Sequence, residues 1–122
     1  MTAVSFGDLP LASQTRRWNG AAANRRVRRW AGAQEEPTAR YRRAFAWYDA
    51  RAQDNFTAYK LQIADIVDGE LTAVPRAVIS AAAVMQGSRG GVDLPPDDVP
   101  AVRNVLARYY KKMGATPPWE CR

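Results

Sequence analysis

The sequence predicts an α+β fold in which a small antiparallel sheet packs with helices. Its 122 residues suit one domain, and 47% apolar side chains are enough for a packed core. Two apolar runs flank the pair Asp68-Gly69, which supplies the positive φ values of a type I′ hairpin turn. Later in the chain, apolar residues recur at helical spacing. Three helices are expected, over about 20–31, 75–86 and 99–113.

The first helix has both of its end signals. Asn19 can cap residues 20–31, and Gly32 is a typical stop. One face of this helix is apolar, formed by Ala23, Val27 and Trp30, and the opposite face is cationic. The sequence therefore predicts an amphipathic helix with a broad basic side.

Alternating residues predict the strands. Tyr59, Leu61 and Ile63 alternate with polar residues, so residues 59–67 and 70–74 are expected to pair across the Asp68-Gly69 turn. Residues 41–48 are a possible third strand because their aromatic residues alternate with smaller ones. Helical spacing also fits that segment, so both interpretations stay open.

The last two helices begin near prolines. Pro75 suits a first helical position, and residues 77–85 are apolar nearly all round, which is typical of a buried helix. Asp97 or Asp98 is expected to cap the final helix, with Pro100 in its first turn. Gly114 is the expected stop.

Three segments follow from this assignment. Residues 1–17 are predicted to form an extended arm, residues 18–113 a single compact α+β domain, and residues 114–122 an extended Pro-rich tail. The arm and the tail carry apolar residues that would anchor the chain on a partner: Phe6, Leu9, Leu11 and Trp119.

Positive charge is concentrated in the first half of the chain. The net charge is +6, and residues 16–43 hold nine arginines against two glutamates. Guanidinium groups bind carboxylates or phosphates in a bidentate manner and stack on aromatic rings. Two interpretations remain: an arginine face that docks on an acidic protein, or a nucleic-acid surface. In both, the candidate residues are Arg25, Arg28, Arg29, Arg42 and Arg43.

Composition argues against most catalytic chemistry. With no histidine and the single cysteine Cys121, the chain lacks Ser-His-Asp and Cys-His arrangements and the usual zinc ligands. Asp65, Asp68 and Glu70 are acidic neighbours that could hold a cation. The hairpin turn explains Asp68 better, and solvent-facing strand positions explain Asp65 and Glu70 better. We expect no enzyme, no cofactor and no metal. No membrane span or signal peptide is expected, and the lone thiol suits a reducing compartment.

An ordered series of motifs resembles a small protein family of tailed bacteriophages and prophages. The similar stretches cover nearly the whole chain: FGDLPLA at 6–12, RRVRRWA at 25–31, AWYD at 46–49, YKLQIAD at 59–65, VPRA at 74–77 and ARYYKKM at 107–113. Members of this family are encoded alone in head-gene clusters or lie beside prohead-protease domains. The family has no established activity, and no protease catalytic residues can be transferred to this chain.

The resemblance implies a structural protein of the virion head, either a capsid decoration or cement protein or a head-assembly factor, that binds the shell without catalysis. Its expected partner is the major capsid protein or another head protein, with copies arranged on a symmetric assembly. It would be in the host cytoplasm before assembly and in the virion head afterwards. The alternative is a basic phage protein that binds nucleic acid, DNA above all, through its arginine-rich helix face.

Overall fold

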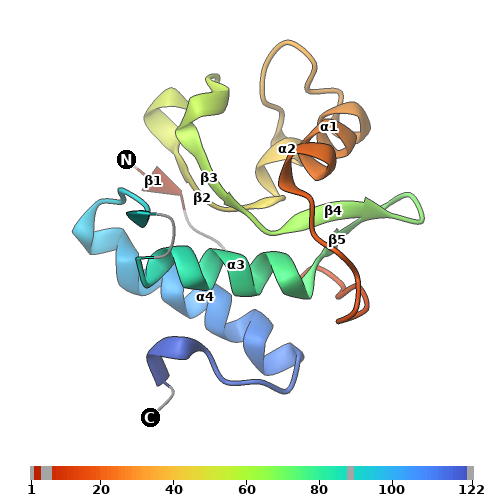
Figure 1. Cartoon of the computed structure of the whole chain (residues 1–122). Coiled ribbons are helices and arrows are strands. Elements are labelled where there is room, and N and C mark those ends of the chain that lie inside the picture. The colour runs from red at the N-terminus through yellow and green to blue at the C-terminus, as the bar shows by residue number, and fades with distance from the viewer. Residues whose placement is uncertain (1, 4–6, 88–89, 121–122) are drawn as a thin grey trace.

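The computed structural model describes residues 2–3, 7–87 and 90–120 of the chain. Two small antiparallel sheets lie in a middle layer, as Figure 1 shows. Helices α1 (Gly20–Ala31) and α2 (Ala39–Arg42) cover one side, and α3 (Pro75–Met85) and α4 (Val99–Lys112) cover the other. The α+β fold class is therefore confirmed. Phe6, Cys121 and parts of the predicted arm and tail lie outside the described residues.

Helix α1 begins and ends where the sequence predicted. The Asn19 side chain accepts a hydrogen bond from the Ala22 amide at 3.1 Å, and Gly32 ends the helix in the left-handed region at φ 67°. Ala23, Val27 and Ala31 are its buried residues. Because that face points to the sheets, the arginines of α1 lie at its margins or on the outside.

The third strand exists, but it is shorter than predicted. Residues 39–42 form the short helix α2, and β2 spans Phe45–Asp49. Strand β2 lies in the middle of a three-stranded sheet, between the two-residue β1 (Thr2–Ala3) and β3 (Tyr59–Gln62). The two periods that overlapped in the sequence thus belong to two successive elements, a helical turn and a strand.

The predicted strand over 59–67 is broken in two. Leu61 has φ 63°, and Ile63 separates β3 from β4 (Ala64–Val67). The Ile63 amide donates to Ala44 O at 2.9 Å, while its carbonyl accepts from the Val74 amide at 2.9 Å. Ile63 therefore bonds to neighbours of both sheets. The hairpin and β2 belong to different sheets as a result, which corrects the prediction of one three-stranded sheet.

The hairpin turn itself is confirmed. Strand β4 pairs antiparallel with β5 (Glu70–Ala73), and Val67 is opposite Glu70. Asp68 and Gly69, between them, have φ 52° and 80°, the positive values that a type I′ turn needs.

Helices α3 and α4 pack against each other beneath the sheets (Figure 1). Pro75 is the first residue of α3, as predicted, but the helix is buried on one face only. Ala77, Val78, Ala81 and Ala82 are buried, whereas Ile79 keeps 49% of its surface exposed. The prediction of an all-round buried helix is therefore wrong, because the sheets and α4 cover α3 from one side.

Helix α4 starts at Val99 with Pro100 in its first turn. Asp98 stands at the cap position, but its side chain makes no cap hydrogen bond. Its Oδ2 instead accepts from the indole Nε1 of Trp47 at 2.9 Å. The predicted capping role of Asp98 is therefore replaced by a bond that ties α4 to β2. Gly114, at φ 72°, follows the end of the helix as expected.

The described part of the N-terminal arm is packed on the body. Leu9 is 2% exposed, and its amide donates to the Tyr109 hydroxyl at 3.1 Å. Residues 10–12 run beside β5, where Ala73 N donates to Pro10 O at 2.8 Å and Ala12 N donates to Ala73 O at 2.9 Å. Leu11 is half-buried against the core. In this conformation Leu9 is a core residue, so its predicted role as a partner anchor is wrong.

The described part of the C-terminal tail also returns to the body. Pro117 is buried, and Trp119 packs edge-on against Tyr110 with ring centroids 6.5 Å apart. Arg103 lies 5.7 Å from the Trp119 ring centroid. Trp119 of the tail therefore packs against α4, and its ring is only partly available to a partner.

Candidate functional site

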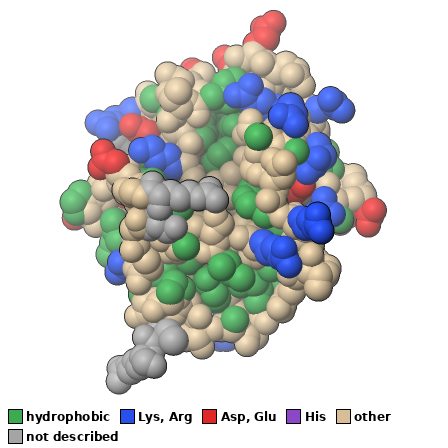
Figure 2. Space-filling view, in the orientation of Figure 1, with side chains coloured by type: hydrophobic (Ala, Val, Ile, Leu, Met, Phe, Trp, Pro, Cys, Tyr) green, Lys and Arg blue, Asp and Glu red, His purple; other side chains and the backbone are tan. Residues whose placement is uncertain are grey.

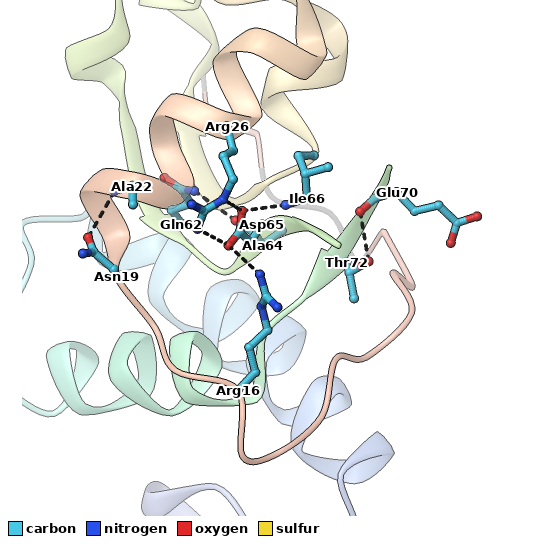
Figure 3. Close-up of polar contacts among 10 residues, drawn as sticks. All are labelled: Arg16, Asn19, Ala22, Arg26, Gln62, Ala64, Asp65, Ile66, Glu70 and Thr72. Carbon is cyan, nitrogen blue, oxygen red and sulfur yellow. Dashed lines mark hydrogen bonds and ion pairs between the residues drawn. The ribbon is translucent and has the colours of Figure 1, made fainter. Parts of the chain in front are cut away.

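Two arginines of the basic segment are used inside the fold. Arg26 of α1 binds both oxygens of Asp65, with Nε–Oδ1 at 2.9 Å and Nη2–Oδ2 at 2.7 Å. Arg16 approaches the same Oδ2 from the N-terminal segment at 3.3 Å. Figure 3 shows the two side chains reaching Asp65 from opposite sides. We call this contact of Arg16 and Arg26 with Asp65 the clasp; it links the N-terminal segment, α1 and β4.

Asp65 is 2% exposed, so it carries its charge inside the protein. Burial by itself raises the pKa of a carboxyl group, but the bonds from Arg26, the Ile66 amide and Arg16 outweigh it. The pKa of Asp65 is therefore lowered, and the group is a carboxylate at neutral pH. Asp65 is thus a structural anion, and its two arginines already have a carboxylate partner within the chain.

Three other arginines lie over aromatic rings. The Arg28 guanidinium is 3.6 Å from the centroid of Phe56, and that of Arg40 is 4.4 Å from Trp30. Arg42 donates to the Tyr59 hydroxyl at 3.0 Å and lies 5.9 Å from the Tyr48 ring. Stacking of this kind orients a guanidinium. The Nε of Arg28 is buried and that of Arg42 donates to Tyr59, so any partner would have to bind the remaining N–H groups of these two side chains.

The rings under Arg28 and Arg42 belong to one aromatic cluster. Tyr41 is central, with centroids 4.9 Å from Phe45 and 5.2 Å from both Phe56 and Tyr59. Tyr48 stacks on Tyr59 at 5.1 Å with an interplanar angle of 10°. A rigid aromatic base therefore holds Arg28 and Arg42 in place.

The remaining predicted arginines are free on the surface. Arg25, Arg29 and Arg43 are exposed, and no hydrogen bond or ion pair within the described part of the chain engages their guanidinium groups. In Figure 2 a group of Lys and Arg side chains gathers on the α1 side of the molecule. We define the arginine surface as these three residues together with the ring-bound arginines, that is Arg25, Arg28, Arg29, Arg40, Arg42 and Arg43.

A shallow cleft borders this surface. It has a volume of about 410 Å³ and lies between Trp30, Arg40 and Arg43 on one side and the hairpin residues Gly69 and Glu70 on the other. Two guanidinium groups therefore share a cleft with a single carboxylate. An acidic side chain of a partner fits this charge balance.

The five predicted basic residues thus lie on α1 and at the C-terminal end of α2, but they differ in role. Sequence reasoning missed Arg40 as a candidate. Arg40 and Trp30 are separated by a Pro-containing loop, so their spacing in the sequence gave no signal that they are in contact. It also assigned Asp65 to a solvent face, whereas the break at Ile63 turns Asp65 inward.

The acidic neighbours of the hairpin do not form a cation site. Asp65 is bound by the two arginines, and Asp68 is exposed in the turn. Among the residues that the structure describes, no three Asp, Glu, Cys or His side chains are grouped as metal ligands would be. No helix in the described ranges has the length and apolar character to cross a bilayer.

Comparisons with protein-family models, with curated proteins and with solved structures find no match to this chain. The family resemblance of the sequence therefore rests on its motifs alone, and function is argued from the surface just described.

Proposed function

We propose that this chain is a non-catalytic structural protein of the tailed-phage head, a decoration protein or an assembly factor, that docks on the capsid shell through its arginine surface. The observation that carries the proposal is the stacking of Arg28, Arg40 and Arg42 on aromatic rings beside the exposed Arg25, Arg29 and Arg43. The motif resemblance supplies the phage-head setting. Because Leu9, Leu11 and Trp119 pack on the body, the docking contacts are assigned to the arginines instead of the termini.

Orientation is what makes this surface suited to docking. A free arginine side chain loses rotamer entropy of about 2 kcal/mol when a partner immobilises it. Arg28, Arg40 and Arg42 are already held over rings, so less of that entropy remains to be lost. Capsid carboxylates would be bound by preoriented, planar donors.

The test is co-sedimentation of the purified protein with empty heads of the phage that encodes it. We expect the wild type to pellet with heads and R25A/R29A to lose about tenfold or more in affinity, since two exposed charges at an interface are removed. The matched control is R76A/K111A, which removes the same charge from exposed positions on α3 and α4. It is expected to bind within about twofold of the wild type.

Absence of wild-type protein from the head pellet at low salt would refute the proposal. Equal losses for the two double variants would also count against it, because binding would then follow net charge and not the arginine surface.

DNA binding is the second candidate, and one specific observation favours it. Arginines and aromatic rings alternate in space on this surface, as Arg28–Phe56 and Arg42–Tyr48 show. Single-strand binders combine cations with stacking rings in this way. Gel shifts with a single-stranded 30-mer should then show affinity that falls steeply with salt and falls again in R25A/R29A. No shift at 20 mM salt would exclude this function.

A further inference from the structure

Among the residues that the structure describes, the open edge of β3 carries backbone groups without partners. Strand β3 lies at the end of its sheet, beside β2. The Ile63 amide bonds to Ala44 O, and Phe45 is opposite Gln62 while Trp47 is opposite Lys60. Counted from the Ile63–Ala44 bond, the register places Lys60 and Gln62 at non-bonded positions of the antiparallel ladder, on either side of Leu61 with its φ of 63°. Their N–H and C=O groups therefore point away from β2.

Nothing in the described part of the chain takes up these four groups. The backbone of Lys60 and Gln62 makes no hydrogen bond there beyond the ladder to β2. The comparable edge of β5 is different, because residues 10–12 run along it and bond to Ala73. One sheet edge is thus covered by the chain itself, and the other is left open.

A groove runs along the open edge. Its volume is about 420 Å³, and Lys60, Leu61 and Gln62 form one wall. The opposite wall is α3, which contributes small side chains such as Ser80 and Ala81. Trp18 and Val92 also line it. The groove therefore combines apolar lining from residues such as Leu61, Val84 and Val92 with the polar side chains of Lys60, Gln62 and Ser80.

We propose that this groove binds an extended segment of an acidic partner protein, which adds to β3 as a further strand. An extended peptide presents N–H and C=O groups on alternate residues, and this spacing matches Lys60 and Gln62. Its apolar side chains enter the space between Trp18 and Val92. Its carboxylates face Lys60, the one charged side chain lining the groove within the described residues.

Charge selects an acidic partner over a second copy. The Lys60 ammonium donates to the backbone carbonyl of Asp93 at 2.9 Å, and no carboxylate of the described chain lies within ion-pair distance of it. Pairing two β3 edges would bring two such ammonium groups together in chains that each carry +6. An acidic strand neutralises the same charge. This proposal goes beyond the arginine surface and does not depend on it.

The experiment selects displayed random twelve-residue peptides on the wild-type protein with counter-selection against S80W, which fills the groove from α3. Enriched peptides are synthesised and their Kd values are measured by fluorescence polarisation. We expect alternating apolar and acidic residues. S80W should weaken binding tenfold or more, and A83W, on the same helix but outside the groove, should change it less than about twofold.

Strand addition has its own control. N-methylation of the two peptide amides that face β3 should weaken binding about tenfold, because two backbone hydrogen bonds are lost. In the free protein, the amides of Lys60 and Gln62 should exchange hydrogen quickly and become protected when peptide binds. V84W is a second groove-filling variant, to be used if S80W does not fold by circular dichroism. R25A/R29A should bind these peptides like the wild type. The groove proposal and the capsid-docking proposal can therefore fail independently of each other.

Three results would overturn the proposal. The first is a selection that yields no peptide rejected by the groove-filling variants. The second is binding that is insensitive to N-methylation, which would mean that only side chains are recognised. The third is a dimer in analytical ultracentrifugation that S80W dissociates, which would assign the edge to a second copy.

Discussion

Asp65 offers the sharpest test of how the N-terminal segment, α1 and the hairpin are held together. The substitution D65N keeps the side-chain volume but removes the negative charge that binds both Arg26 and Arg16. Removing one member of a fully buried ion pair costs about 3–5 kcal/mol. The Arg16 and Arg26 side chains are 34% and 46% exposed and can reach water, so we expect a loss of about 2–3 kcal/mol of unfolding free energy.

The assay is urea denaturation followed by tryptophan fluorescence at pH 7. D68N is the matched control, because it removes the same charge from an exposed turn of the same hairpin, where asparagine tolerates φ 52°. We expect that control to change stability by less than about 0.5 kcal/mol. A D65N protein as stable as D68N would refute the clasp as a stabilising contact.

The same contact predicts a pH dependence. The pKa of Asp65 in the folded chain is below its ordinary value, so its stabilisation is complete above the unfolded-state pKa of about 3.9 and is lost as the pH falls further. The stability difference between wild type and D65N should therefore shrink as the pH is lowered from about 4 towards 2. A difference that stays constant over this range would contradict an ionised Asp65.

Three further substitutions test particular elements. L9A should cost about 2–4 kcal/mol in urea denaturation because Leu9 is a core residue, whereas I79A, at an exposed position, should cost under about 1 kcal/mol; equal effects would return Leu9 to the surface. G32A should cost about 1 kcal/mol, since φ 67° is strained for alanine although no atom lies within 4 Å of a Cβ there; an unchanged melting temperature would contradict the left-handed cap. N19A should cost about 1 kcal/mol and speed hydrogen exchange at the Ala22 amide, and a protected amide in that variant would exclude the cap.

Much of the local structure could be predicted because its signals are local. Asn19, Gly32 and Pro75 mark helix ends through backbone geometry that neighbouring residues alone determine. The Asp68-Gly69 turn is of the same kind. The break at Leu61 and Ile63 had no such signal, because leucine rarely takes a positive φ and the bonds of Ile63 to Ala44 and Val74 join segments that are distant along the chain.

The candidate site divides in the same way. Arginine enrichment on α1 was visible from helical spacing, and the exposed Arg25 and Arg29 lie where that spacing places them. The partners of Arg28 and Arg42 were not visible, because Phe56 and Tyr59 reach them through contacts between elements. Leu9 was mistaken for a partner anchor since its core contact, Tyr109, lies 100 residues away.

By itself, the sequence determined the α+β class, the boundaries of the three long helices, the hairpin turn and the concentration of positive charge, because these depend on residues that are close along the chain. Only the tertiary structure decided which arginines form ion pairs with Asp65 and which remain without one on the surface. It also decided that the N-terminal segment covers the β5 edge and that the described residues leave the β3 edge open. Those outcomes depend on long-range packing and pairing, in which one group has several possible partners and the fold selects among them.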